Sequence, residues 1–159
     1  MLKKTTRKIR KTAGARFAVV ASRYNAEYVD GMLHVAESIL KRGGAAKIEV
    51  LRVPGSFEVP VVAATLARRK AGRPDVILCF GVIWQGETTH AQHIGEAVSF
   101  ALMDISVETG VPVIHQVLTV ATQEQAVARC LTPETNRGAE AAHTALAMVE
   151  TLRLARKKS

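Results

Sequence analysis

A glycine, two threonines and a histidine stand close together near the middle of the chain, as Gly86, Thr88, Thr89 and His90. They follow a short apolar run and precede a long amphipathic segment, an order that predicts strand, loop and helix. A helix start can hold an anion, usually phosphate, because its backbone N–H groups are unpaired and its dipole end is positive. Gly86 lets backbone approach such a ligand, and the threonine hydroxyls can bind it or cap the helix. His90 can move protons near neutral pH.

This pattern has a plainer alternative, an ordinary connection that carries a surface histidine. It is neither a P-loop nor a dinucleotide fingerprint, because the required glycine and lysine spacings are absent. His90 and His93 are three residues apart, but nothing near them in the sequence completes a ligand set, so no metal site is expected.

Aromatic and polar residues also follow two other predicted strands. Tyr24 offers a flat face for a planar ring, or packs as a surface aromatic on its own helix. Phe57 is expected in the core or in a pocket wall. Glu58 can accept hydrogen bonds from hydroxyls or amides, or simply favour a helix start. Farther along, Arg129 and Arg137 could each reach a phosphate, including one on a neighbouring subunit, or be ordinary surface charges.

Strands and helices are predicted to alternate along the chain. Asn25 is expected to cap the first helix and Thr122 the fourth. Apolar runs predict strands at 16–21, 48–53, 76–80 and 111–118, and helical periodicity predicts helices at 27–42, 60–71, 90–109, 122–130 and 138–156. Near-continuous apolar strands are typical of a parallel sheet covered on both faces. We therefore predict an α/β, flavodoxin-like three-layer sandwich with a four-stranded, mainly parallel sheet and helices on both faces. Ligands bind such sheets at the carboxyl ends of the strands, where Tyr24, Glu58 and His90 would meet.

The net charge of +8 is concentrated at the ends of the 159-residue chain. Residues 1–12 hold six basic side chains and residues 153–159 hold four, whereas all 14 acidic side chains lie in 13–152, whose net charge is −2. This predicts a basic arm at 1–14, a folded domain at 15–152 and a basic tail at 153–159. With 4% aromatic residues there is little surface on which bases could stack, which argues against a nucleic-acid partner.

The cysteines and the apolar runs bear on the compartment. Cys79 and Cys130 are far apart and form no CxxC pair, and Cys79 is expected to be a buried thiol. No secretion signal and no apolar run of membrane-spanning length is visible. These features predict a cytoplasmic protein without a membrane partner.

Six short motifs occur in a fixed order along the chain: Ser22–Asn25, Val53–Pro60, Gly86–His90, Glu108–Ile114, Val117–Thr119 and Asn136–Ala142. Together they resemble the 6,7-dimethyl-8-ribityllumazine synthase family of the riboflavin pathway. Each is weak by itself, but the ordered set is specific and spans about residues 15–152. A flavodoxin-like binding module of another kind would not explain this set.

The resemblance implies a condensation of two small-molecule substrates. The amine of 5-amino-6-(D-ribitylamino)uracil attacks the ketone of 3,4-dihydroxy-2-butanone 4-phosphate. An imine forms, phosphate leaves, and the ring closes with loss of water to give 6,7-dimethyl-8-ribityllumazine. No metal and no redox cofactor is implied, and positioning of the two substrates supplies much of the rate.

The resemblance also assigns roles to residues. The aminouracil is expected to contact eight residues: Tyr24 by stacking, the pocket-lining Ser56, Phe57 and Glu58, the backbone of Val82, Ile83 and Trp84, and His115. The phosphate is expected to lie on Gly86, Glu87 and Thr88, with Arg129 contributed by the adjacent subunit. His90 is the proton-transfer residue. Active sites between subunits imply a homo-oligomer built on pentamers, and riboflavin synthase is a candidate partner.

Several positions depart from the common family pattern. Gln85 stands where many members have arginine, and His115 where a phenylalanine often reaches into the neighbour's pocket. Gln92-His93 replaces a frequent Asp-Tyr pair, and Pro133 stands where lysine is common. These changes motivate an alternative, a catalytically weak paralogue that binds lumazine or flavin or forms a shell. The short segment 131–137 resembles that of shell-forming members.

Overall fold

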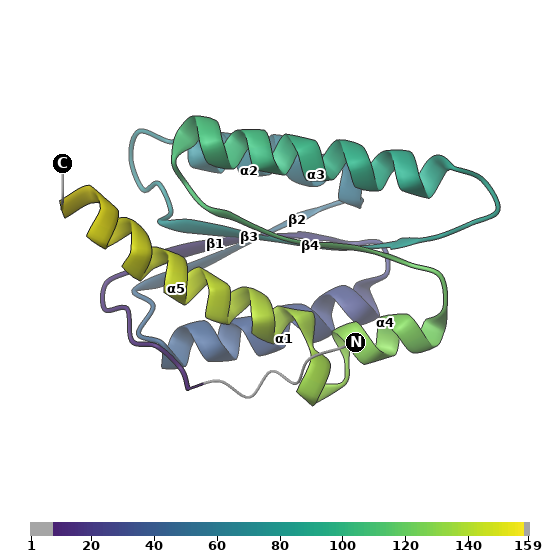
Figure 1. The fold of residues 1–159 in the computed structure, drawn as a ribbon, viewed down its shortest axis with the longest axis horizontal. Helices are drawn as coiled ribbons and strands as arrows, with labels where there is room; N and C mark the ends of the chain where they lie inside the picture. The colour runs from purple at the N-terminus through teal and green to yellow at the C-terminus, as the bar shows by residue number, and fades with distance from the viewer. Residues whose placement is uncertain (1–7, 158–159) are drawn as a thin grey trace.

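Four parallel strands form the centre of the protein, for which a computed structural model describes residues 8–157 (Figure 1). The strands are β1 (Arg16–Ser22), β2 (Lys47–Val53), β3 (Val76–Trp84) and β4 (Val113–Val120), in the spatial order β2-β1-β3-β4. All three strand pairs are parallel. This confirms the predicted α/β flavodoxin-like class, with a sheet that is wholly parallel. The basic residues Lys3, Lys4, Arg7 and Lys158 lie outside the described residues.

Helices cover both faces of the sheet (Figure 1). One face carries α2 (Val59–Ala67) and α3 (His90–Thr109), and the other carries α1 (Ala26–Arg42), α4 (Gln123–Cys130) and α5 (Arg137–Lys157). Short 3₁₀ turns, η1 (Ser56–Glu58) and η2 (Pro133–Thr135), precede α2 and α5. The alternation of strand and helix thus produces the three layers.

The two inner strands, β1 and β3, are buried on both sides, which explains their continuous apolar sequences. Successive side chains of a strand point to opposite faces. Phe17 and Val19 of β1 join the core beneath α1 and α5, while Ala18 and Val20 join the core beneath α2 and α3. Two packed cores therefore hold the carboxyl ends of these strands rigidly in place.

Three elements differ from prediction by two residues or more at an end. β3 continues to Trp84 instead of ending at Phe80, so the connection to α3 is much shorter than expected. Gly81 lies inside the strand, where a Cβ atom would come within 2.4 Å of the Ser56 hydroxyl; the glycine marks a close approach and not a loop. β4 begins and ends two residues later than predicted, and α2 ends at Ala67 instead of residue 71.

One helix cap was predicted correctly and one was not. Thr122 caps α4, because its hydroxyl accepts a hydrogen bond from Gln125 N at 3.3 Å. Asn25 occupies the cap position of α1, but its side chain makes no capping bond. Its amide is used instead for contacts with β3, to Val82 and Trp84.

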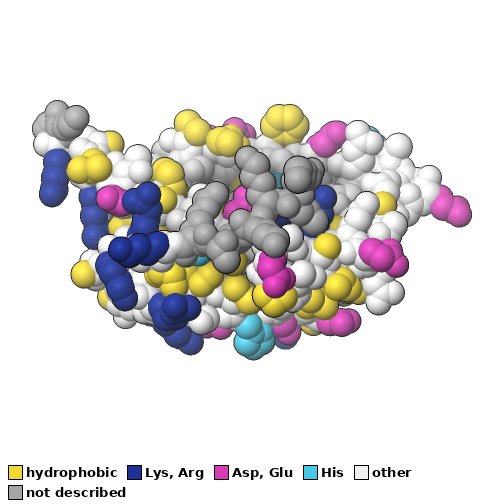
Figure 2. Space-filling view, turned by 60° about the horizontal axis from the view of Figure 1, so that its bottom comes forward, with side chains coloured by type: hydrophobic (Ala, Val, Ile, Leu, Met, Phe, Trp, Pro, Cys, Tyr) yellow, Lys and Arg dark blue, Asp and Glu magenta, His cyan; other side chains and the backbone are white. Residues whose placement is uncertain are grey.

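Basic side chains gather on the α1–α5 face, toward the end that holds the C-terminus of α5 (Figure 2). They come from three segments: residues 8–11, the end of α1 and the last turns of α5. Arg10 pairs with Glu150 of α5, and Lys11 donates to the Arg42 carbonyl at the end of α1. No helix within residues 8–157 is both long enough and apolar enough to span a membrane.

Candidate active site

A cleft of about 380 Å³ opens at the carboxyl ends of β1, β2 and β3. The chain runs from β1 outward to β2 and returns to β3 on the other side of β1, so the cleft lies at the switch point where ligands bind in open α/β sheets. Its lining residues are Tyr24, Asn25, Gly55, Ser56, Phe57, Glu58, Val82, Ile83, Trp84 and Ile94. Seven of the eight residues predicted to contact the aminouracil are among them, and His115 is not.

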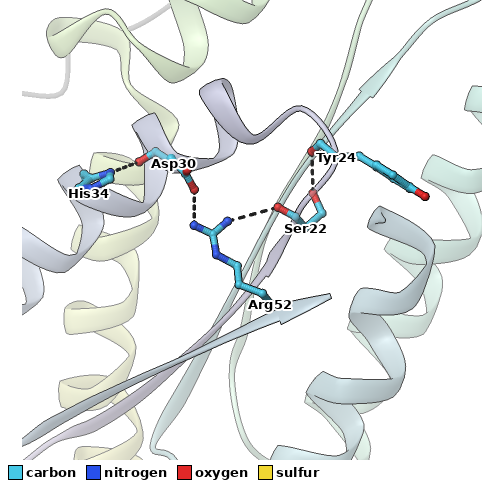
Figure 3. A network of polar contacts seen from close by, with 5 residues as sticks. All are labelled: Ser22, Tyr24, Asp30, His34 and Arg52. Carbon is cyan, nitrogen blue, oxygen red and sulfur yellow. Dashed lines mark hydrogen bonds and ion pairs between the residues drawn. The ribbon is translucent and has the colours of Figure 1, made fainter. Parts of the chain in front are cut away.

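Tyr24 is presented by a turn that is fixed to β2. Arg23 N donates to Val53 O at 2.8 Å, and Tyr24 N donates to Pro54 O at 3.1 Å, which continues the β1–β2 pairing beyond the strands. Arg52 adds side-chain contacts to Asp30 of α1 and to Ser22 O (Figure 3). The Tyr24 ring points away from this network and is 68% exposed. A rigid backbone thus carries an aromatic face that is free to stack.

The η1 turn brings Phe57 and Glu58 to the second side of the cleft. Glu58 accepts a hydrogen bond from Gly55 N at 2.9 Å, which orients its carboxylate. A Cβ atom on Gly55 would lie 3.0 Å from both the Glu58 carboxylate and the Tyr24 ring, so a larger residue would push against these two groups. Phe57 is 61% exposed, so it forms a pocket wall and is not a core residue.

The end of β3 forms the floor of the cleft with an open edge. β1 pairs with β3 only as far as Phe80, whereas β4 pairs with β3 as far as Trp84. Alternate peptide groups between Val82 and Trp84 therefore face the β1 side without a strand partner. An open edge of this kind can exchange hydrogen bonds with the edge of a planar heterocycle.

The connection from β3 to α3, residues 85–89, is exposed. Gln85 Nε2 donates to Gly86 O at 3.3 Å, so the residue that stands in place of arginine braces the loop. The backbone N–H groups of residues 86–89 donate to no other residue in 8–157. With the start of α3 behind them, these free donors suit an anion.

His90 is the first residue of α3 and is exposed. Thr88 Oγ1 accepts from His90 N at 3.4 Å, while Thr89 makes no side-chain cap. Ile94, which lines the cleft, follows one helical turn later on the same face. His90 therefore lies at the rim, between the cleft and the free N–H groups of the loop.

His115 lies on the edge strand β4, and both of its ring nitrogens are engaged within the chain. Nδ1 accepts from Val117 N at 3.0 Å, and Nε2 lies 2.7 Å from Ser99 Oγ, which donates to Gly95 O. The bond from Val117 requires an unprotonated Nδ1, so Nε2 carries the proton and the ring is neutral. Partial burial against α3 also lowers the pKa of His115.

Arg129 is not brought to the cleft of its own chain. It lies on α4, which packs with α1 and α5 on the face of the sheet opposite α3. It is half-buried and forms no ion pair with a residue in 8–157, whereas Arg137 pairs with Glu140. The sheet therefore lies between Arg129 and the β3–α3 connection, residues 85–89, of the same chain.

Neither the cysteines nor the residues that could bind a metal form a further reactive site among the described residues. Cys79 and Cys130 are both free and buried. Burial raises the pKa of both thiols, that of Cys130 to about 11, so neither is a thiolate near neutral pH. Within 8–157 no three His, Cys, Asp or Glu side chains come together as a metal site would require.

Sequence reasoning missed Asn25, Gly55 and Ile94 as lining residues. Ile94 lies one turn after His90, a signal that was present in the spacing. It also missed a surface on α3, the apolar stripe formed by Phe100, Met103 and Val107, which are 71%, 63% and 75% exposed. Their i, i+3, i+7 spacing places them on one outer face.

Comparisons with known proteins agree on one family. The model of the 6,7-dimethyl-8-ribityllumazine synthase family matches residues 14–153. A 6,7-dimethyl-8-ribityllumazine synthase of Halorhodospira halophila is 41% identical over 141 residues, covering 87% of this chain and 89% of the relative. A protein of Caulobacter vibrioides named 6,7-dimethyl-8-ribityllumazine synthase 1 is 40% identical over 91% of this chain and 94% of its own. A synthase of Arthrobacter sp. is 39% identical over 94% and 91%.

Proposed function

The chain belongs to the 6,7-dimethyl-8-ribityllumazine synthase family, and we propose that the cleft and the adjoining loop are where its reaction takes place. The enzyme is a transferase of riboflavin biosynthesis that condenses 5-amino-6-(D-ribitylamino)uracil with 3,4-dihydroxy-2-butanone 4-phosphate. The products are 6,7-dimethyl-8-ribityllumazine, phosphate and water. One observation carries this assignment. A cleft with aromatic walls lies next to the free N–H groups of residues 86–89, and His90 lies between them.

The part of the site for the aminouracil, which we call the ring half, comprises Tyr24, Ser56–Glu58 and the end of β3. Tyr24 stacks on the pyrimidine, Phe57 covers the opposite wall, and Ser56 lines the inner end. Glu58 accepts hydrogen bonds from ribityl hydroxyls, a role that its fixed carboxylate supports. The open edge of β3 at Val82, Ile83 and Trp84 hydrogen-bonds the uracil, which is supported by its lack of a β1 partner.

The part for the butanone phosphate, the anion half, comprises the loop with Gly86, Glu87 and Thr88, then His90, and Arg129 of a neighbouring copy. The N–H groups of the loop and the helix dipole bind the phosphate. Arg129 adds the full positive charge and bidentate geometry that phosphate favours, and Gln85 no longer supplies a charge there. Within residues 8–157 Arg129 forms no ion pair, which supports this role.

The reaction then needs a proton carrier and close positioning. The amine of the aminouracil attacks the ketone, and the resulting carbinolamine loses water to give an imine. Phosphate leaves, and the ring closes with further loss of water. His90 shuttles protons for these steps, since it lies between the ring half and the anion half. Holding both substrates together supplies much of the remaining rate.

Assembly as pentamers completes the site. The apolar stripe of Phe100, Met103 and Val107 exposes large side chains that an isolated chain would leave in water, which supports a subunit contact on α3. A cyclic, head-to-tail contact would bring the β4–α4 side of one copy to the cleft of the next. His115 would then present its ring to the neighbour's pocket. A cytoplasmic location, supported by the two free cysteines, and a partnership with riboflavin synthase belong to the same proposal.

Turnover with both substrates, followed by lumazine absorbance, tests this function. The wild type is expected to form lumazine, and His90→Ala to be slower by roughly ten-fold or more. His93→Ala is the matched control, since His93 is also exposed on α3 but lies about one turn farther from the N–H groups of residues 86–89. Binding of the aminouracil without turnover by the wild type would contradict the proposal and favour the weak paralogue. Equal loss in both variants would remove His90 as the proton carrier.

A further inference from the structure

Asn25 has an unusual backbone and an unusually placed side chain. Its φ of 58° and ψ of 41° lie in the left-handed region, and it is the only non-glycine residue in 8–157 with a positive φ. Asparagine tolerates this conformation better than most residues. The conformation turns the chain out of β1 and leaves the amide beside β3.

The amide makes two hydrogen bonds to the open end of β3. Nδ2 donates to Val82 O at 2.8 Å, and Oδ1 accepts from Trp84 Nε1 at 2.9 Å. A carbonyl only accepts and an indole N–H only donates, so the orientation of the amide is fixed. The Trp84 indole is held from a second side by the Tyr28 ring, edge to face at 5.7 Å and 81°.

The two Asn25 hydrogen bonds lie beyond the point where β1 stops pairing with β3. On its β2 side, the turn after β1 continues the sheet with the backbone bonds of Arg23 and Tyr24. On its β3 side, backbone pairing has already ended at Phe80. The Asn25 side chain replaces it, and because its bond to Val82 uses one carbonyl only, the other peptide groups of this edge stay open.

We propose that Asn25 is a positioning residue that, with the Trp84 indole N–H, holds the end of β3 in the geometry that meets the uracil. This inference rests on the proposed function, because it concerns the ring half. The alternative is that the two bonds only stabilise the turn. The two cases differ in which substrate is affected: loss of a positioning group weakens use of the aminouracil and leaves the butanone phosphate unaffected.

The test compares Asn25→Gly, Trp84→Phe and the double variant in the full-length protein. Glycine accepts the positive φ, so Asn25→Gly removes the amide without backbone strain. We expect its kcat/KM for the aminouracil to fall about ten-fold, as for a lost hydrogen-bond pair, with the KM for the butanone phosphate unchanged. Trp84→Phe keeps a ring and loses one bond, so a loss of about three-fold is expected. The double variant is expected to have the same kcat/KM for the aminouracil as Asn25→Gly, because both substitutions remove the same hydrogen bond between Asn25 and Trp84.

Fluorescence gives an independent readout, since Trp84 is the only tryptophan in the sequence. We expect the emission of Asn25→Gly to shift toward that of a solvated indole and the emission of the wild type to change on titration with the aminouracil. Lower thermal stability with an unchanged KM for the aminouracil would overturn the inference and leave the proposed function intact. A wild type that binds no aminouracil would overturn both.

Discussion

The ring half and the anion half of the site differ in how much of each a single chain builds. In the ring half, backbone bonds to β2, the carboxylate of Glu58 on Gly55 N and the open edge of β3 are all in place within one chain. In the anion half, one chain supplies an exposed loop and His90, while its own Arg129 lies across the sheet. In the proposed site, the ring half would take only His115 from a neighbour, whereas the anion half would take Arg129, its full positive charge, from one.

This difference separates two sources of activity. The ring half depends on the turns after β1 and β2 and on the end of β3, which the two cores hold rigidly, so it should bind its substrate in any assembly that keeps the fold. As proposed, the anion half takes the Arg129 charge from a second copy, so binding of the butanone phosphate should weaken strongly when the contact between subunits is lost. Variants in the two halves are therefore expected to affect different substrates.

The largest effect is expected from Arg129→Ala. Removing the guanidinium leaves the phosphate without its full positive counter-charge, which typically costs about 2–5 kcal/mol, so kcat/KM for the butanone phosphate should fall roughly a hundred-fold. Aminouracil affinity should stay near that of the wild type. Steady-state kinetics with each substrate varied in turn measures this split.

Arg137→Ala is the control for that variant, because sequence alone left both arginines as candidates. Arg137 already pairs with Glu140, so its loss should change turnover little. A larger loss from Arg137→Ala than from Arg129→Ala would reverse the assignment.

A smaller effect is expected from Tyr24→Ala. Loss of one aromatic stacking partner typically costs about 1–3 kcal/mol, so the aminouracil should bind roughly ten- to a hundred-fold more weakly. Tyr24→Phe keeps the ring and should stay close to the wild type. Calorimetric titration with the aminouracil measures this, and equal affinities for Tyr24→Ala and the wild type would show that the ring half does not use this face.

The smallest effect is expected from His115→Gln, and it depends on pH. The folded protein lowers the pKa of His115 below its ordinary value, so the unfolded chain binds more protons in the interval between the two. The stability that the neutral ring contributes is present above its ordinary pKa of 6.5 and is lost as the pH falls toward the folded value. His115→Gln should therefore lose less stability than the wild type between about pH 7.5 and pH 5.

The free energy of unfolding, measured by denaturant titration at both pH values, gives the comparison. A steeper loss in His115→Gln than in the wild type would show that the protonated ring is the favoured form in the folded protein.

Local patterns were sufficient for much of this fold and for several of the residues that line the cleft. Apolar runs that alternate with helical periodicity predicted the parallel sheet, and chemistry at strand ends led to Tyr24, Phe57 and Glu58. The true end of β3 could not be predicted, because a glycine after an apolar run normally indicates a loop. Only the structure shows that Gly81 lies inside the strand, where Ser56 packs against it.

Other features depended on contacts between distant segments. Asn25 is a normal helix cap by type, and only its left-handed backbone turns the amide toward β3. The resemblance placed His115 where a side chain reaches into a neighbouring pocket. Its hydrogen bonds to Ser99 and Val117 could not be predicted, because no local sequence pattern connects these residues. The position of Arg129 relative to the cleft followed only from the layer that α4 joins.

The central claim is that each site uses His90 of one subunit and Arg129 of the next, and co-assembly of two inactive variants tests it most directly. Subunits carrying His90→Ala and subunits carrying Arg129→Ala would be mixed in equal amounts, reassembled and assayed for lumazine formation. Random mixing in a cyclic oligomer gives about one quarter of the sites both intact residues, so about a quarter of wild-type turnover should return. Turnover no higher than the mean of the two separate variants would show that the site does not combine these residues from two subunits.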